Sequence, residues 1–238
     1  MNTVQSIPPA FTPVSTASAS ERVVFVRKTY AHLALAVLGF VFLEAIFLNT
    51  PWIVEIGISM LDGWFWLAAL GGFMFVTNLA ESWAYESTNK RSQYIALSVY
   101  VFAEALLFVP LMYLAIAITG DFALLAQAGL ITFSLFLGLT SVAVWTKQDF
   151  SFLRTSLFVG SFIAMGLIVA GIAFGFSLGL WFSVAMVGLA SVAILYQTTQ
   201  VMTAYHTEQY VAASLGLFSA LMLLLWYVIN ILFSLMGE

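Results

Sequence analysis

A single carboxylic acid, Glu104, lies in the middle of the apolar stretch ALSVYVFAEALLFVPLMYLA. Charge is costly inside a bilayer, so an acid at this depth is a candidate functional group. Two interpretations stay open for it. It can be a neutral, protonated acid that hydrogen-bonds a neighbouring helix, or a binding site for protons or cations. Pro110 follows six residues later, where it is expected to kink the helix and free a backbone carbonyl.

Three further residues are candidates for an ion or proton pathway. Glu44 lies in another apolar stretch, nearer its end, where it could also reach the membrane interface beside Asn49. Gln197 and Thr198 belong to a neutral polar run in AILYQTTQVM. Amide and hydroxyl groups donate and accept hydrogen bonds, but they do not titrate near neutral pH. Glu104 is therefore the main acid of any such pathway.

Other kinds of chemistry find little support in the chain. There is no cysteine, and His32 and His206 are far apart, which makes a poor metal site. No HExxH, GxSxG or phosphate-binding glycine loop is present, so we expect neither an enzyme nor a cofactor. No apolar stretch holds a lysine for a retinal Schiff base, and no basic cluster suggests nucleic acid.

The composition predicts what positions these residues. The chain has 238 residues, 63% of them hydrophobic and 8% charged, whereas soluble domains carry about 25% charged residues. Long unbroken apolar runs predict a bundle of membrane-spanning helices embedded in the lipid bilayer, not a barrel. The predicted spans are Tyr30–Leu48, Trp64–Ala80, Gln93–Ile118, Phe122–Trp145, Thr155–Phe176, Leu178–Met202 and Tyr210–Met236. The stretch Trp52–Leu61 is too short to cross, so it lies in the interface or extends the second helix.

The basic residues predict the orientation of the bundle. With seven spans, all of them fall on one side, and the opposite loops carry only acids. The basic residues are Arg22, Arg27, Lys28, Lys90, Arg91, Lys147 and Arg154. Because cytoplasmic loops are enriched in Lys and Arg, we expect a cytoplasmic N-terminus and a C-terminus, at Glu238, outside.

The N-terminal residues differ from the rest in composition. The first 20 are rich in Ser, Thr, Ala and Pro, and they lack the pattern of a cleavable signal peptide. We expect a flexible cytoplasmic tail over residues 1–28 and a transmembrane domain over residues 29–238. On the last predicted helix, Ala212, Gly216 and Ala220 recur every four residues, which favours close helix packing and a central position for that helix.

Several motifs in order along the chain resemble the Bax inhibitor family. They are VRKTYAHLALAVLGF, FAEALLFVP, TKQDFSFL, ILYQTTQVM and YVAASLGLFSAL, and the similarity runs from about Val26 to Leu235. The resemblance implies a seven-helix bundle with its last helix near the centre. It also implies, for many members, a calcium leak that responds to pH.

The resemblance assigns family positions to three residues. Asp149 lies in the motif TKQDFSFL. The family's gate is associated with two aspartates, and the matching residues here are Gln197 and Ala220. An amide and a methyl group cannot share a proton as two carboxylates do. The resemblance therefore predicts altered pH sensing at this pair, and a loss of both charged oxygen ligands for a divalent ion.

The missing acid pair points to a bacterial branch of the family. Members of that branch are associated with a membrane-bound AAA protease, as substrates or modulators, and a tail such as Met1–Ser20 would suit its engagement. Two functions stay open, with a bacterial inner membrane as the expected location. One is a leak pathway for calcium or protons, and the other is a protease modulator that does not transport. A lipid or stress role is a third.

Overall fold

The computed structural model describes residues 12–86, 89–146 and 148–236, and over these ranges the protein is helical. Its elements are η2 (Val14–Thr16, a single 3-10 turn), α1 (Ala19–Leu48), α2 (Pro51–Ser59), α3 (Gly63–Glu86), α4 (Lys90–Thr119), α5 (Ala123–Thr146), α6 (Leu153–Phe174), α7 (Gly179–Thr203) and α8 (Tyr210–Met236). All the α-helices except α2 are long and apolar enough to cross a membrane. The prediction of an all-helical bundle with seven spans is confirmed.

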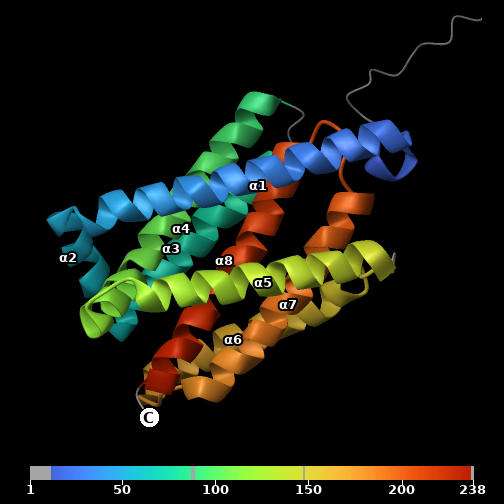
Figure 1. Ribbon diagram of the computed structural model, residues 1–238. Helices are drawn as coiled ribbons and strands as arrows, with labels where there is room; N and C mark the ends of the chain where they lie inside the picture. Colours follow the sequence, from blue (N-terminus) through green and yellow to red (C-terminus); the bar gives the residue numbers. More distant parts are fainter. Residues whose placement is uncertain (1–11, 87–88, 147, 237–238) are drawn as a thin grey trace, which may run out of the picture.

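Helix α8 lies at the centre of the bundle (Figure 1). It packs against α1, α3, α4, α5 and α7. Within its most apolar window, 61% of the residues are buried by protein, compared with 50% for α4 and 28% or less for the other spans. A helix that is apolar all round and covered on every side by other helices is the expected core of such a bundle. The predicted central position of the last helix is confirmed.

The first helix begins earlier than the apolar pattern predicts. It starts at Ala19 instead of Tyr30, because Ser18 and Glu21 form a capping box. The Ser18 hydroxyl accepts a hydrogen bond from the Glu21 amide at 3.3 Å, and the Ser18 amide donates to Glu21 Oε2 at 2.9 Å. The predicted boundary between residues 28 and 29 therefore falls inside α1.

The segment before α1 is docked against the bundle. The Val14 amide donates to the carbonyl of Tyr205 at 2.9 Å, and the Thr207 amide donates to the carbonyl of Thr12 at 3.1 Å. Val14 is fully buried. The predicted flexible tail thus does not apply to Thr12 and Val14, because backbone pairing and apolar burial fix them. Residues 1–11 of that predicted tail lie outside the described residues.

The short helix α2 is separate from both of its neighbours. Pro51 stands at its start, where a missing amide proton costs nothing, and a turn at residues 60–62 separates it from α3. Gly57 lets α2 approach α4, since a Cβ atom there would lie 2.6 Å from Val109 Cγ1. The stretch is too short to cross, as predicted, and it packs on α4 instead of extending α3.

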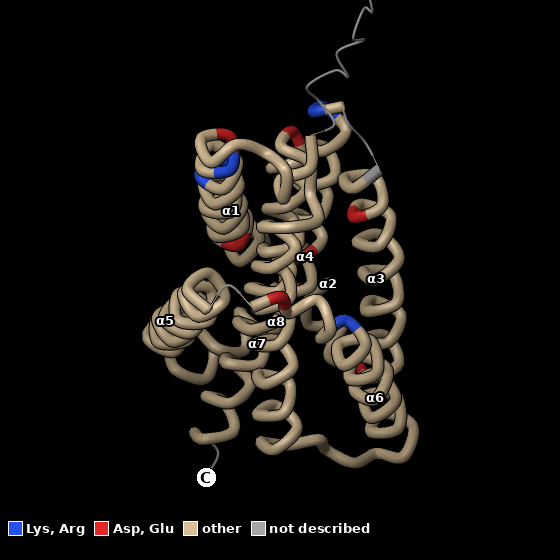
Figure 2. Tube along the Cα trace, turned by 90° about the vertical axis from the view of Figure 1, so that its right-hand side faces the viewer, with Lys and Arg blue, Asp and Glu red and all other residues tan. Residues whose placement is uncertain are grey.

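The described Lys and Arg residues gather toward one end of the bundle, which we call the basic end. It holds the beginnings of α1, α4, α6 and α8. Figure 2 views this end, and blue segments are visible on α1, at the top of the picture and at one end of α6. Lys147 lies outside the described residues. The cytoplasmic orientation of the basic end stays a prediction.

Candidate functional site

A polar cavity of about 660 Å³ opens near the basic end, between α3, α6, α7 and α8. Its wall on α3 follows helical spacing, because Asn78, Glu81, Ser82 and Tyr85 occupy positions i, i+3, i+4 and i+7 of one face. The other lining residues are Ala84, Arg154, Tyr196, Gln197, Gln200, Ala204, Tyr205, Ala212, Leu215 and Gly216. An acid, a cation and several amides therefore face one space.

An aromatic cavity of about 560 Å³ lies toward the opposite end of the bundle. Each helix around it contributes one face, again at helical spacing. The residues on α3 are Trp66, Leu70 and Phe73, those on α4 are Tyr100, Glu104, Leu107 and Phe108, and those on α8 are Ser219, Leu223, Trp226, Tyr227, Asn230 and Ser234. Residues of α6, α7 and the loop between them close the remaining side: Ile168, Gly171, Ile172, Phe176, Leu178, Gly179, Phe182 and Ser183.

The two cavities approach one another along α8. Gly216 lines the polar cavity and Ser219 lines the aromatic cavity. Three residues of an α-helix correspond to about 4.5 Å along its axis. At this level the Tyr100 hydroxyl donates to Ser219 Oγ at 2.7 Å, and the rings of Tyr100 and Phe218 meet edge to face with centroids 6.1 Å apart. We call Tyr100, Phe218 and Ser219, which meet at this level of α8, the septum.

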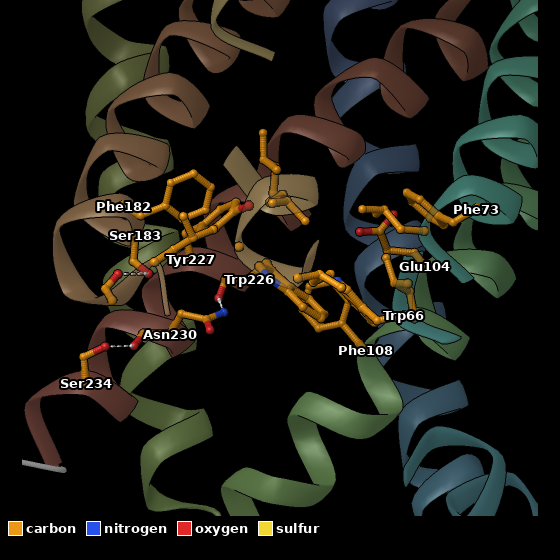
Figure 3. Close-up of a pocket in the computed structure, with 18 of the residues that line it drawn as sticks. Trp66, Phe73, Glu104, Phe108, Phe182, Ser183, Trp226, Tyr227, Asn230 and Ser234 are labelled. Atoms are coloured by element: carbon orange, nitrogen blue, oxygen red, sulfur yellow. Dashed lines mark hydrogen bonds between the residues drawn. The ribbon is translucent and has the colours of Figure 1, made fainter. Parts of the chain in front are cut away.

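Glu104 projects into the aromatic cavity one helical turn beyond Tyr100. The residue is 5% exposed, and its Oε2 atom has no hydrogen-bond partner in the described part of the chain. Figure 3 shows its carboxyl group beside Phe73, with Trp66, Phe108 and Trp226 in the middle of the cavity and Asn230 and Ser234 on the far side. The structure thus places the predicted main acid in a cavity whose described lining residues include neither lysine nor arginine.

Gln197 faces the polar cavity and rests against Gly216 of α8. A Cβ atom on Gly216 would lie 2.8 Å from Gln197 Oε1, so the absent side chain makes room for the amide. Gln197 can bind a cation or water through that oxygen, but it cannot take up or release a proton at neutral pH. The polar run of α7 therefore supplies at least one cavity-lining group.

Glu81 is the functional candidate that sequence reasoning missed. The predicted second span ended at Ala80, whereas α3 continues to Glu86 and carries Glu81 into the polar cavity. The face of polar residues at helical spacing on α3 was the available signal. Arg154, which sequence reasoning used only for orientation, lines the same cavity.

Comparison with known proteins supplies the family. The family model described as "Inhibitor of apoptosis-promoting Bax1" matches residues 22–237. The chain belongs to this family. Two bacterial relatives, Uncharacterized protein NMA0420 of Neisseria meningitidis serogroup A and Uncharacterized protein NMB2020 of serogroup B, are each 30% identical over 143 residues. These alignments cover 60% of this chain and 63% of each relative. The resemblance to the Bax inhibitor family is confirmed.

The two positions that match the family's aspartate pair lie on facing helices of this Bax inhibitor family protein. Gln197 lines the polar cavity, and Ala220 is buried on α8, one turn beyond Gly216. Of the predicted packing residues, Ala212 and Gly216 also line the polar cavity, whereas Ala220 lines neither cavity. The place of the pair is thus next to the septum, and no acid occupies either of its positions.

Two other predicted pathway residues lie away from the cavities. Thr198 is buried, and its hydroxyl donates to the Ile194 carbonyl of its own helix at 2.7 Å. Glu44 is 5% exposed and has no partner for either carboxyl oxygen among the described residues. It is buried by protein and does not reach the interface beside Asn49, whose amide donates to the Ala45 carbonyl at 2.7 Å. Neither Thr198 nor Glu44 lines either cavity.

Asp149 of the family motif lies between α5 and α6, at the basic end. The Ser151 amide donates to Asp149 Oδ1 at 2.9 Å. Hydrogen bonds from the Ser151 side chain and backbone hold the pKa of Asp149 below its ordinary value, because they stabilise the carboxylate. The next residue, Phe150, donates its amide to the Thr199 hydroxyl at 3.4 Å, which attaches this loop to α7. In the described ranges no three His, Cys, Asp or Glu side chains gather as a metal site.

Proposed function

We propose that this member of the Bax inhibitor family is a cation leak pathway, for calcium or protons, that joins the polar cavity to the aromatic cavity. The observation that carries the proposal is the approach of the two cavities to within one turn of α8, at Gly216 and Ser219. Each cavity also contains one carboxylic acid, Glu81 in the first and Glu104 in the second. Acids placed along a route through a membrane are the usual means of carrying cations or protons.

The residues of the route have separate roles in this proposal. Glu81 and the amide oxygen of Gln197 attract a cation at the basic end, and Arg154 in the same cavity limits its occupancy by repulsion. Glu104 then binds the cation, or carries the proton, beyond the septum. Gln197 and Ala220 do not titrate near neutral pH, so the pH response of the leak depends on Glu81 and Glu104 instead of the family's acid pair.

In this proposal the septum is the gate of the route. Phe218 is fully buried, and the Tyr100 hydroxyl is engaged with Ser219. Conduction requires this hydrogen bond to open, so that both hydroxyl groups can bind water or the ion. Rotation of the Tyr100 and Ser219 side chains breaks this hydrogen bond.

The proposal is tested by calcium and proton flux in proteoliposomes, from about pH 6 to pH 8, a range that brackets a carboxyl perturbed by burial. The Glu104→Gln variant should lose the flux or its pH dependence. Glu44→Gln is the matched control, because Glu44 is equally buried but lines neither cavity. Equal flux in the native protein and Glu104→Gln, or no flux in folded native protein, would refute the pathway.

A second function, modulation of a membrane-bound AAA protease in a bacterial inner membrane, is favoured by the docked N-terminal segment. Thr12, which follows residues 1–11 in the sequence, pairs with Thr207 at the basic end, where a cytoplasmic machine would act. Deletion of residues 2–11 should then change degradation or complex formation and leave flux unchanged. Unchanged degradation and association after the deletion would argue against this role.

A further inference from the structure

We infer that the aromatic cavity is a binding site for a hydrophobic organic monocation, an amine or quaternary ammonium carried on an apolar body. The inference combines three observations: a buried acid with one unpartnered carboxyl oxygen, walls of aromatic rings, and a volume suited to an organic molecule. It concerns the same cavity as the proposed function, but binding requires no transport through the septum.

The charge of the ligand follows from the lining residues. They include one carboxylic acid, Glu104, and neither lysine nor arginine. Glu104 lines the cavity, and its Oε2 atom is buried and lacks a hydrogen-bond partner among the described residues. An unpaired buried carboxyl is costly, and a cation placed beside it offsets that cost. A single acid favours a monocation and disfavours an anion.

The walls next to Glu104 suit an ammonium group. Trp66 and Trp226 are stacked with centroids 5.4 Å apart at 16°, and Phe108 meets Trp226 edge to face at 5.0 Å. Tyr100 and Phe73 form another edge-to-face pair with centroids 6.1 Å apart. The faces of aromatic rings attract cations, and such rings recognise quaternary ammonium groups elsewhere.

The opposite side of the cavity offers weaker recognition. Asn230 Nδ2 donates to the Trp226 carbonyl at 2.8 Å, and the Ser234 hydroxyl donates to the Asn230 carbonyl at 3.0 Å. These donors are already used within α8, so the acid and the rings carry the specificity. The apolar body of the ligand would lie along Leu107, Ile168 and Leu223.

The size of the cavity distinguishes an organic ligand from a resident metal ion. A volume of about 560 Å³ falls within the range of small-molecule pockets. Calcium takes about six to eight oxygen ligands. This cavity is lined mainly by apolar and aromatic side chains around one acid. An organic cation satisfies the carboxyl group and fills the apolar space at the same time.

The test is direct binding of phenylpropyltrimethylammonium to the full-length protein in phosphatidylcholine nanodiscs, with empty nanodiscs subtracted. Its uncharged tert-butyl isostere is the matched ligand. We expect Glu104→Gln to weaken binding of the cation by about tenfold or more, and Trp226→Leu to weaken it as well. Glu44→Gln should bind like the native protein, because Glu44 does not line the cavity.

Three results would overturn the inference: no binding of the cation, equal affinity of the native protein and Glu104→Gln for the cation, or equal affinity of the native protein for the cation and the uncharged isostere. The last of these results would identify a lipid-filled space. Binding without flux supports the site while refuting the leak pathway. Flux without binding supports the pathway and refutes the site.

Discussion

The polar cavity and the aromatic cavity lie on either side of one turn of α8, and each holds a carboxylic acid in a different setting. Glu81 shares its cavity with Arg154, Gln197 and other polar groups near the basic end. Glu104 faces aromatic rings, without a base, deeper in the bundle. Near a helix end, water and polar neighbours stabilise an acid, whereas deep in the bundle an acid must stay neutral or gain a bound cation.

The two cavities also differ in how firmly their walls are held. At the polar cavity, the wall between α7 and α8 is formed by the side chain of Gln197, which rests against Gly216 and is flexible. The wall of the aromatic cavity consists of interlocked rings, and at Gly171 it is backbone. We therefore expect substitutions at the aromatic cavity to cost more stability than substitutions at the polar cavity.

The largest effect is expected for Phe108→Ala. Phe108 is almost fully buried and meets Phe40 and Trp226 edge to face at 5.1 and 5.0 Å. Removing the ring leaves a void, which costs about 3–5 kcal/mol in the free energy of unfolding. Thermal unfolding in a mild detergent measures this loss. Phe75→Ala is the control, because Phe75 is 73% exposed on the outer surface of the bundle. Similar losses in both variants would show that the ring cluster is not rigid.

An intermediate effect is expected for Gly171→Ala. A Cβ atom there would lie 3.1 Å from the Phe176 carbonyl oxygen, which belongs to the backbone after α6. That backbone is itself held by a hydrogen bond of 3.0 Å from the Phe176 amide to the Gly171 carbonyl. Neither the new Cβ atom nor the Phe176 carbonyl oxygen can move without the backbone that carries it. We therefore expect a loss of about 1–3 kcal/mol in the free energy of unfolding. A variant as stable as the native protein would contradict a fixed wall at this end.

A smaller effect on stability is expected for Tyr100→Phe at the septum. The change removes the hydrogen bond of 2.7 Å to Ser219, which contributes about 1 kcal/mol. Ser219→Ala should cost a similar amount, and the double variant should cost less than the sum of the two. Unfolding measurements on all three variants give the coupling energy. Strict additivity would mean that the two hydroxyl groups do not depend on each other.

The smallest effect is expected for Gly216→Ala at the polar cavity. The new methyl group meets the end of the Gln197 side chain, which can rotate into the cavity, and alanine favours a helix over glycine. We expect the unfolding free energy to change by less than about 1 kcal/mol. Gly72→Ala on α3 is the control, since no described atom beyond its chain neighbours and its own helix backbone lies within 4 Å of its Cβ position. A loss as large as that of Gly171→Ala would show that the walls of the polar cavity and the aromatic cavity are held equally firmly.

Much of the fold was predictable because membrane helices depend mainly on apolar length. Six of the seven predicted spans begin within about three residues of the observed helices, as Gln93 and Lys90 illustrate for α4. The exception is α1, whose first turns are polar and whose start depends on the Ser18 and Glu21 capping box. An apolar pattern alone does not show such a start.

The site was predictable only in part. Glu104 was identified because a single acid interrupts an apolar run. Glu81 was missed because it follows the end of such a run, where an acid is unremarkable without knowledge of what faces it. The stacking of Trp66 on Trp226 was missed too, because Trp66 lies near a helix end, where tryptophan is typical of the membrane interface. Which faces of distant helices enclose a space depends on tertiary packing.

The most direct test of the account is cysteine accessibility, for which this cysteine-free chain is suited without prior substitutions. Gln197→Cys, Ser219→Cys and Thr198→Cys would each be exposed to a small, membrane-impermeant thiol reagent applied to either side of sealed vesicles. The account predicts modification of Gln197→Cys from the side of the basic end, of Ser219→Cys from the opposite side, and of Thr198→Cys from neither. Modification of Gln197→Cys and Ser219→Cys from the same side, or of neither variant, would contradict the claim that two cavities approach one another at α8.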